Sequence, residues 1–132
     1  MYKHAEVTEW VIGAFYDVYN ALGYGFLEAV YERALALELE KLGLHVVPQA
    51  RIQVSYAGHV VGDYFADLLV EDKVLIEVKA VRSLHEEHEA QLLNYLKATR
   101  YEVGLLLNFG PKPQLKRKAY DNTRKGTLDW MK

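Results

Sequence analysis

The sequence contains no cysteine among its 132 residues. This absence excludes disulfide bonds and thiolate metal sites, and it suits a reducing compartment, so we expect a cytoplasmic protein. Long apolar runs are also missing, because no stretch approaches the roughly 20 residues that are needed to span a bilayer. The first residues, Met1 to Glu6, lack the pattern of a signal peptide. We therefore expect a soluble chain that does not contact membranes.

Internal repeats, low-complexity tracts and interdomain linkers are absent as well. With 132 residues, of which 51% are hydrophobic, the chain has room for one core. We expect a single domain over residues 1–132.

A large excess of charge of one sign is missing too, since the formal net charge is −2. The charge is nevertheless uneven: residues 112–132 contain seven Lys or Arg against two Asp, a net of +5, which leaves −7 for the rest. The cluster of Lys116, Arg117 and Lys118 would suit the phosphate backbone of a nucleic acid. A solvated terminal segment without such a role is an equally good interpretation.

Hydrophobic periodicity and turn residues predict the elements of the fold. In chain order they are helices at 5–21 and about 26–42, a strand beyond Pro48 that includes 52–56, a longer strand that ends near Val70, a strand at 74–80, a helix at about 86–99, and a strand at 103–109 that ends at Gly110–Pro113. The third helix can act as a crossover to a parallel neighbour. The order predicts an α/β fold with a mixed central sheet flanked by helices.

Charged residues stand in a hairpin that otherwise looks buried. Asp67 lies in the longer strand, and Glu77-Val78-Lys79 closes the next one. A three-residue loop at 71–73 would set Asp67 directly opposite Glu77, and strands that are apolar on both faces are usually central. Two adjacent buried carboxylates must be paired, lose their charge or bind a cation. The alternative is that these groups lie near strand ends in contact with water, with Lys79 neutralising one carboxylate.

The third helix carries a polar stripe. His88, Gln91 and Tyr95 lie within a narrow arc beside an apolar face. Gln91 and Tyr95 would lean toward the hairpin carboxylates and hold a phosphate or a water, although a solvated boundary with a snorkelling tyrosine explains the stripe equally well. A zinc site is rejected because His85 and His88 are three residues apart, whereas the helical zinc motif requires four. For Glu28, a favourable interaction with a helix dipole is a sufficient explanation without a site.

These residues together carry a resemblance to a known family. The run Gly25–Tyr31 resembles the signature of the GxxExxY proteins, a family placed in the PD-(D/E)xK nuclease superfamily. Asp67 is similar to the metal-binding aspartate of that superfamily, and Glu77-Val78-Lys79 is similar to its ExK element. Gln91 and Tyr95 look like the QxxxY element of one branch. The resemblance extends from the first helix to Gly110, and it implies a restriction-endonuclease-like core of order αβββαβ, preceded by an extra helix.

The resemblance also implies a function, the metal-dependent hydrolysis of phosphodiester bonds in nucleic acid, with DNA favoured over RNA. Asp67, Glu77 and the carbonyl of Val78 would bind one or two Mg²⁺ or Mn²⁺ ions, and hard oxygen ligands suit these cations. Glu28 would be an additional carboxylate, and Lys79 would orient the attacking water or stabilise the transition state. The residues expected to position the substrate phosphate are His88, Gln91 and Tyr95. The alternative is a noncatalytic nucleic-acid- or protein-binding module, and a homodimer or another protein partner is possible in either case.

Overall fold

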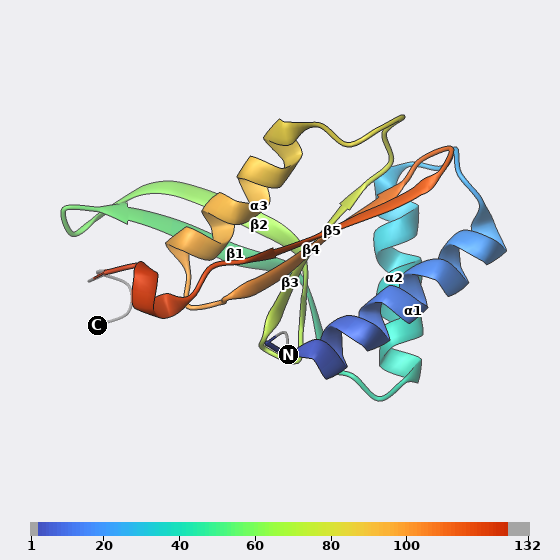
Figure 1. The fold of residues 1–132 in the computed structure, drawn as a ribbon, viewed down its shortest axis with the longest axis horizontal. Coiled ribbons are helices and arrows are strands. Elements are labelled where there is room, and N and C mark those ends of the chain that lie inside the picture. Colours follow the sequence, from blue (N-terminus) through green and yellow to red (C-terminus); the bar gives the residue numbers. More distant parts are fainter. Residues whose placement is uncertain (1–2, 127–132) are drawn as a thin grey trace.

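A computed structural model gives the structure of the protein, and it describes residues 3–126 (Figure 1). The helices and strands, in chain order, are α1 (Ala5–Leu22), α2 (Glu28–Lys41), β1 (Val46–Tyr56), β2 (His59–Val70), β3 (Val74–Lys79), α3 (Glu86–Ala98), β4 (Val103–Phe109) and β5 (Pro113–Ala119), followed by the 3-10 turn η1 (Asn122–Arg124). Within this range no helix combines the length and the apolar character that crossing a bilayer requires.

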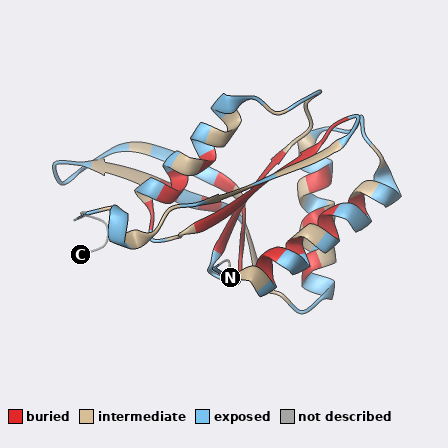
Figure 2. Ribbon diagram, in the orientation of Figure 1, coloured by how far each residue is buried: buried red, intermediate tan, exposed pale blue. Residues whose placement is uncertain are grey.

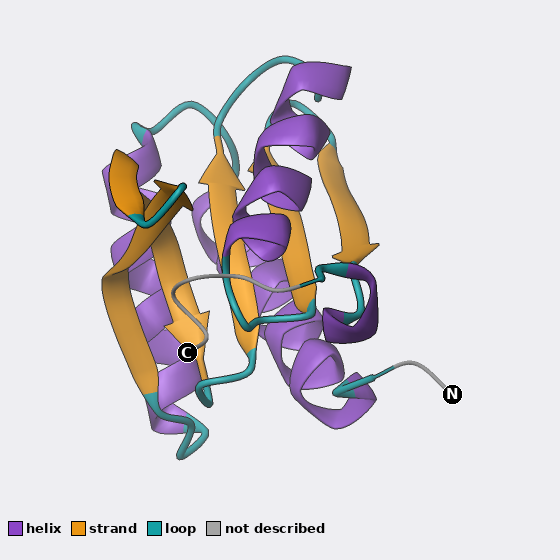
Figure 3. Ribbon diagram, turned by 90° about the vertical axis from the view of Figure 1, so that its left-hand side faces the viewer, coloured by secondary structure: helices purple, strands orange, loops and turns teal. Residues whose placement is uncertain are grey.

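The strands form one mixed sheet in the order β1-β2-β3-β4-β5. Only β3 and β4 run parallel, with α3 as the crossover between them, and the other neighbours are antiparallel. Helices α1 and α2 cover one face of the sheet and α3 covers the other (Figure 3). The prediction of an α/β fold with a flanked mixed sheet and an extra N-terminal helix is confirmed.

Strand β5 is the element that the sequence did not predict. The segment Gly110–Pro113 was expected to end the last strand, but the chain turns there and β5 pairs with β4 from Phe109↔Pro113 to Val103↔Ala119. A proline is tolerated at the first position of an edge strand, where a missing N–H breaks no ladder. The basic residues of this strand concealed it, because they removed the apolar alternation on which a strand prediction depends.

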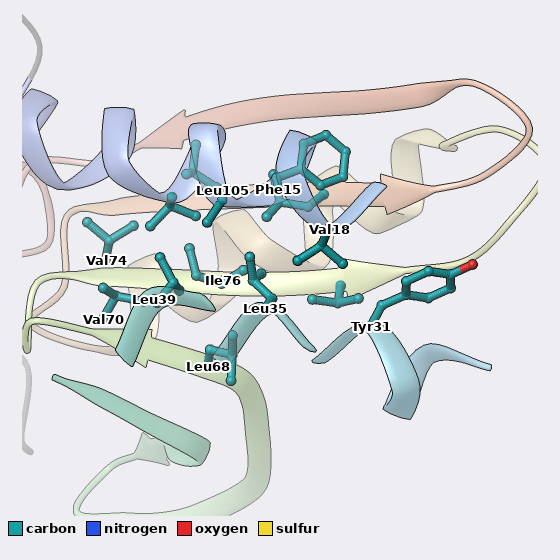
Figure 4. Close-up of a cluster of buried hydrophobic side chains, with 14 of the residues drawn as sticks. Phe15, Val18, Tyr31, Leu35, Leu39, Leu68, Val70, Val74, Ile76 and Leu105 are labelled. Atoms are coloured by element: carbon teal, nitrogen blue, oxygen red, sulfur yellow. The ribbon is translucent and has the colours of Figure 1, made fainter. Parts of the chain in front are cut away.

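Two hydrophobic clusters lie on opposite faces of the sheet. Figure 4 shows the first, in which side chains of α1 and α2 meet the central strands: Phe15, Val18, Tyr31, Leu35, Leu39, Leu68, Val70, Val74, Ile76 and Leu105. The second joins α3 to the other face and includes Leu69, Leu75, Leu92, Tyr95, Leu96 and Leu106. Strands β3 and β4 are therefore buried on both sides (Figure 2), which explains why their sequences are apolar without alternation.

Tyr31 fixes the connection between α1 and α2. Its buried ring stacks on Phe109 at 4.3 Å between centroids. Its hydroxyl donates to the carbonyl of Gly23 at 2.8 Å and accepts from the backbone N–H of Phe26 at 3.2 Å. The tyrosine of the Gly25–Tyr31 run thus holds the loop that ends where α2 begins, at Glu28.

Asn108 fixes the loop that follows β3. Its amide nitrogen donates to the carbonyl of Val81 and its amide oxygen accepts from the N–H of Val81, both at 2.9 Å. Gln114 of β5 accepts a second hydrogen bond from Asn108 at 3.0 Å and one from the N–H of Leu84 at 3.2 Å. The fully buried Asn108 therefore ties the exit of β3 to β4 and β5, in a place where an unpaired amide would be costly.

Gly110 allows this close approach, and a substitution there tests the arrangement. A Cβ at position 110 would collide with the backbone carbonyl of Val81, whereas a Cβ at Gly13, an exposed position inside α1, would meet nothing. We expect Gly110→Ala to destabilise the protein by about 1–3 kcal/mol and Gly13→Ala to stabilise it by up to about 1 kcal/mol. Urea unfolding of the two variants measures the difference, and equal stabilities would contradict the packing described here.

Candidate active site

The candidate site lies where β2 and β3 separate. The ladder between them ends at Leu68↔Ile76, and Asp67 and Glu77 come next in the same register. Here the side chains replace the backbone ladder. A Glu77 carboxylate oxygen accepts from the N–H of Asp67 at 3.1 Å, and an Asp67 carboxylate oxygen accepts from the N–H of Val78 at 2.7 Å. The structure therefore brings these two acids together across the hairpin.

Burial makes the charge on Glu77 unfavourable. The residue is only 4% exposed. Desolvation and the negative charge of Asp67 raise the pKa of Glu77 to about 8, against the opposing effects of the Asp67 backbone N–H and the Lys79 ammonium. Lys79, at the end of β3 and partly exposed, is thus close enough to Glu77 to act on it electrostatically.

Helix α2 adds two further carboxylates. Glu28 accepts from the N–H of Ala80, just beyond Lys79, at 3.3 Å. Glu32 follows one helical turn later, forms a side-chain hydrogen bond with Asp67 and accepts from the side-chain amide of Gln49 at 3.0 Å. Desolvation and the charges of Asp67 and Glu28 raise the pKa of Glu32 to about 7. Four carboxylates therefore meet at one end of the hairpin.

Glu32 and Gln49 were missed in the sequence, although one signal was present. Residues four apart on a helix share a face, so Glu28 and Glu32 could have been linked by spacing alone. No sequence pattern predicted that Gln49 would reach the site, because its backbone adopts a left-handed conformation with φ 51°. The β1–β2 ladder keeps its register from Pro48↔Leu68 to Ala50↔Ala66 but lacks the pair between Gln49 and Asp67, so the strand is distorted locally at this point.

Strict alternation along β2 also fails at the site. The sequence placed Asp67 on the same face as Leu69, but Leu69 and Ala66 both pack in the α3 cluster, although three positions separate them. The alternation breaks between them, and Asp67 lines a pocket of about 520 Å³ together with Glu32 and Leu68, beside α2. The irregular stretch around Gln49 explains how an aspartate of a regular-looking strand reaches α2.

The polar stripe of α3 divides into two parts. Tyr95 is buried, and its pKa is raised by desolvation and by the charges of Glu77 and Asp67, so it lies near the carboxylates. Gln91 donates to the Tyr95 hydroxyl at 3.0 Å. His88 instead accepts from the N–H of His85 at 3.1 Å, which caps the start of α3.

The basic cluster forms part of strand β5. Lys118 pairs with Glu89 of α3 at 2.6 Å, and Arg117 donates to the carbonyl of Lys3 at 2.9 Å. Lys116 is exposed. The last positions of the predicted basic segment, 127–132, lie outside the described residues. The cluster is thus built on an edge strand beside α3 rather than on a loose tail.

The donor set fits a hard divalent cation in its chemistry. Carboxylate oxygens are the ligands that Mg²⁺ and Mn²⁺ prefer, and the raised pKa values of Glu32 and Glu77 reflect negative charges that a cation would stabilise. Among residues 3–126, however, no three His, Asp or Glu side chains are already arranged to hold a metal ion. Asp67, Glu77 and Glu28 each bond a backbone N–H instead.

Comparison with known proteins gives a family and a fold. The model of the PD-(D/E)XK nuclease superfamily matches residues 5–118, a range that contains all the residues discussed above for the site. No curated protein matches the chain. The crystal structure of SSO0001 is similar, with a TM-score of 0.53 and 19% sequence identity over 70% of this chain. The match covers 50% of SSO0001, so this chain spans about half the length of that protein. An alkaline exonuclease from Laribacter hongkongensis is more distant, with a TM-score of 0.42 and 14% identity over 93% of this chain and 74% of its own.

Glu77 gives the protein a pH-dependent stability when cations are removed with EDTA. Its pKa rises from an ordinary 4.5 to about 8 on folding, so between these values the folded state keeps a proton that the unfolded state has released. Stability therefore falls as the pH rises through this window, by at most about 1.4 kcal/mol per pH unit for this one group. Glu32, with a pKa of about 7, adds a slope of its own.

We expect Glu77→Gln to reduce this slope, because the amide keeps an oxygen for the Asp67 N–H but does not ionise. Urea unfolding at several pH values between about 5 and 8 measures it. Glu40→Gln, a change at an exposed position of α2, is the control and should leave the slope unchanged. A slope that is the same in wild type and Glu77→Gln would show that Glu77 does not hold the proton.

Proposed function

Because the chain belongs to the PD-(D/E)XK nuclease superfamily, we propose that it is a metal-dependent nuclease that hydrolyses phosphodiester bonds of nucleic acid, with DNA favoured. The observation that carries the proposal is the meeting of Asp67, Glu77 and Lys79 at the open end of the β2–β3 hairpin. A structural hairpin has little reason to bury Glu77 beside a second acid that repels it. A cytoplasmic location, which the lack of cysteine suits, belongs to the same proposal.

The run Gly25–Tyr31 supports a finer assignment, to the GxxExxY proteins. Its two signature side chains have different tasks in this chain. Tyr31 holds the loop before α2 through the Gly23 carbonyl and the Phe26 N–H. Glu28, at the first position of α2, reaches the backbone next to Lys79. The spacing of the signature thus couples the placement of a helix to a carboxylate of the site.

Metal binding would fall to the oxygen atoms that surround the hairpin. Asp67, Glu77 and the Val78 carbonyl would hold one or two Mg²⁺ or Mn²⁺ ions, with Glu28 as a further ligand. When bound, such an ion lowers the pKa of a water molecule and neutralises charge on the scissile phosphate. Glu32 contacts Asp67 and is held by Gln49, so it orients that aspartate from the side of α2.

The remaining residues act on the substrate directly. Lys79 is the cation next to Glu77, and it would orient the attacking water or stabilise the pentavalent transition state. The Tyr95 hydroxyl accepts a hydrogen bond from Gln91, which leaves its own proton for a phosphate oxygen. Its raised pKa keeps that proton in place at neutral pH. His88 would help to position the substrate phosphate from the start of α3. The three basic residues of β5 would add salt-dependent affinity for the nucleic-acid backbone, and they are Lys116, Arg117 and Lys118.

A second candidate is a noncatalytic module that retains the nuclease fold and binds nucleic acid or a protein. The observation in its favour is that Asp67, Glu77 and Glu28 each bond a backbone N–H, so they have a structural use without a metal. This module would bind nucleic acid in EDTA and after Lys79→Ala, and it would lose binding on charge reversal at Lys116, Arg117 and Lys118. Either function is compatible with a homodimer or with a protein partner.

Removal of Lys79 or of the Asp67 charge tests the catalytic proposal. We expect the wild type to cleave nucleic acid with Mg²⁺ or Mn²⁺ and not in EDTA, and Lys79→Ala and Asp67→Asn to lower the rate by at least about 10²-fold, as loss of a group that stabilises transition-state charge does. Lys73→Ala, an exposed lysine in the turn of the same hairpin, is the matched control and should cleave normally. Labelled single-stranded, duplex and branched DNA and RNA are the substrates, and thermal unfolding shows that each variant is folded. A folded wild type that leaves all of them intact with both metals would refute the nuclease.

A further inference from the structure

Strands β1 and β2 extend beyond the rest of the sheet and form a two-stranded arm. The β1–β2 ladder continues to Tyr56↔His59, whereas β2 leaves β3 at Leu68↔Ile76. The arm runs alongside α3 (Figure 1), and a groove of about 910 Å³ lies between them. This volume is within the range of small-molecule sites, about 300–1,000 Å³.

The groove contains a tyrosine that the core does not require. Tyr64 of the arm packs against Tyr95 of α3, with ring centroids 5.8 Å apart and an interplanar angle of 41°. Tyr95 is 6% exposed, but Tyr64 remains 48% exposed although it lines the groove. Tyr64 thus has support from one aromatic neighbour and open surface for another planar group.

The wall along α3 is close to neutral and carries several uncharged polar side chains among apolar ones. His88, Gln91 and Asn94 follow one another at intervals of three residues and line the groove, as does Ser55 from the arm. One acid and one base line it as well, Glu87 and Lys97. Amide and imidazole groups can both donate and accept hydrogen bonds, which suits the edges of nucleobases better than it suits phosphates.

Tyr95 links the groove to the candidate active site. Its ring lines the groove, its hydroxyl accepts a hydrogen bond from Gln91, and its pKa is raised by desolvation and by the charges of Glu77 and Asp67. A nucleotide whose phosphate reaches the carboxylates would therefore place an adjacent base beside α3 and the arm.

We propose that this groove binds an unpaired nucleobase of the substrate strand, with Tyr64 as the stacking platform. The proposal rests on the proposed function and names the class of substrate: single-stranded nucleic acid or a frayed end. In a duplex each base is stacked between its neighbours and paired at its edge, so it presents neither its face to Tyr64 nor its edge to Gln91 and Asn94. Because the walls of the groove are close to neutral, the phosphates of the strand would instead contact basic residues outside it, such as Lys79 and Lys116.

The experiment measures binding without cleavage. In the Asp67→Asn background with Mg²⁺ present, fluorescence anisotropy gives the affinity for a labelled single-stranded DNA oligonucleotide and for the same sequence as a blunt hairpin duplex. We expect tighter binding of the single strand. Tyr64→Ala should weaken it by roughly 5- to 150-fold, the effect of losing one stacked base, and Tyr64→Phe should retain it.

Tyr56→Ala is the matched control, because Tyr56 lies on the same arm, is 75% exposed and does not line the groove. Its affinity should equal that of the parent. Equal weakening in Tyr56→Ala and Tyr64→Ala, no effect of Tyr64→Ala, absence of single-strand binding, or a preference for the duplex would each overturn the proposal.

The outcomes also separate this proposal from the nuclease. If the wild type cleaves nucleic acid while Tyr64→Ala binds and cleaves single strands normally, the groove assignment is wrong and the nuclease stands. If single strands bind through Tyr64 but the wild type cleaves nothing, the nuclease is wrong and the groove stands.

Discussion

Mutual repulsion of carboxylates in a place with little water is the constraint on which this structure depends. Glu77 is buried beside Asp67, and Glu28 and Glu32 approach from α2. Such a group of acids does not hold together by itself, since each charge loses hydration and gains a like neighbour. Backbone N–H groups, the Gln49 amide, the Lys79 ammonium and raised pKa values compensate for this, and the surrounding fold keeps these compensating groups in position.

The supports of the site come from distant parts of the chain. Tyr31 stacks on Phe109 and sets the start of α2, and therefore the position of Glu28. Asn108 and Gln114 tie down the loop after Lys79. Strand β4 thus supports the acidic group in two places, through Phe109 below α2 and through Asn108 at the loop after β3, although it contributes no carboxylate. Strand β5 adds to the second support through Gln114.

The sequence predicted what depends on short-range pattern. The length of the loop 71–73 set the register that brings Asp67 opposite Glu77, and the order of helices and strands implied the parallel pair and its crossover. It failed where tertiary structure decides. Strand β5 has little apolar alternation and is stabilised by pairing with β4, Gln49 enters the site through a left-handed backbone, and the break in alternation near Asp67 follows from it. The exposure of Tyr64 beside Tyr95 likewise depends on how far the arm overhangs α3.

The arm makes β2 a strand with two local stabilities. From Leu68 to Val70 it is paired on both sides and buried between helices, so its amide hydrogens should exchange with solvent only when much of the domain opens. From His59 to about Gly62 it pairs with β1 alone and is mostly exposed, so the loss of a single ladder is enough to open it. The wall of the groove that Tyr64 belongs to can therefore change shape at small energetic cost, while the strand residues next to Asp67 stay where the core holds them.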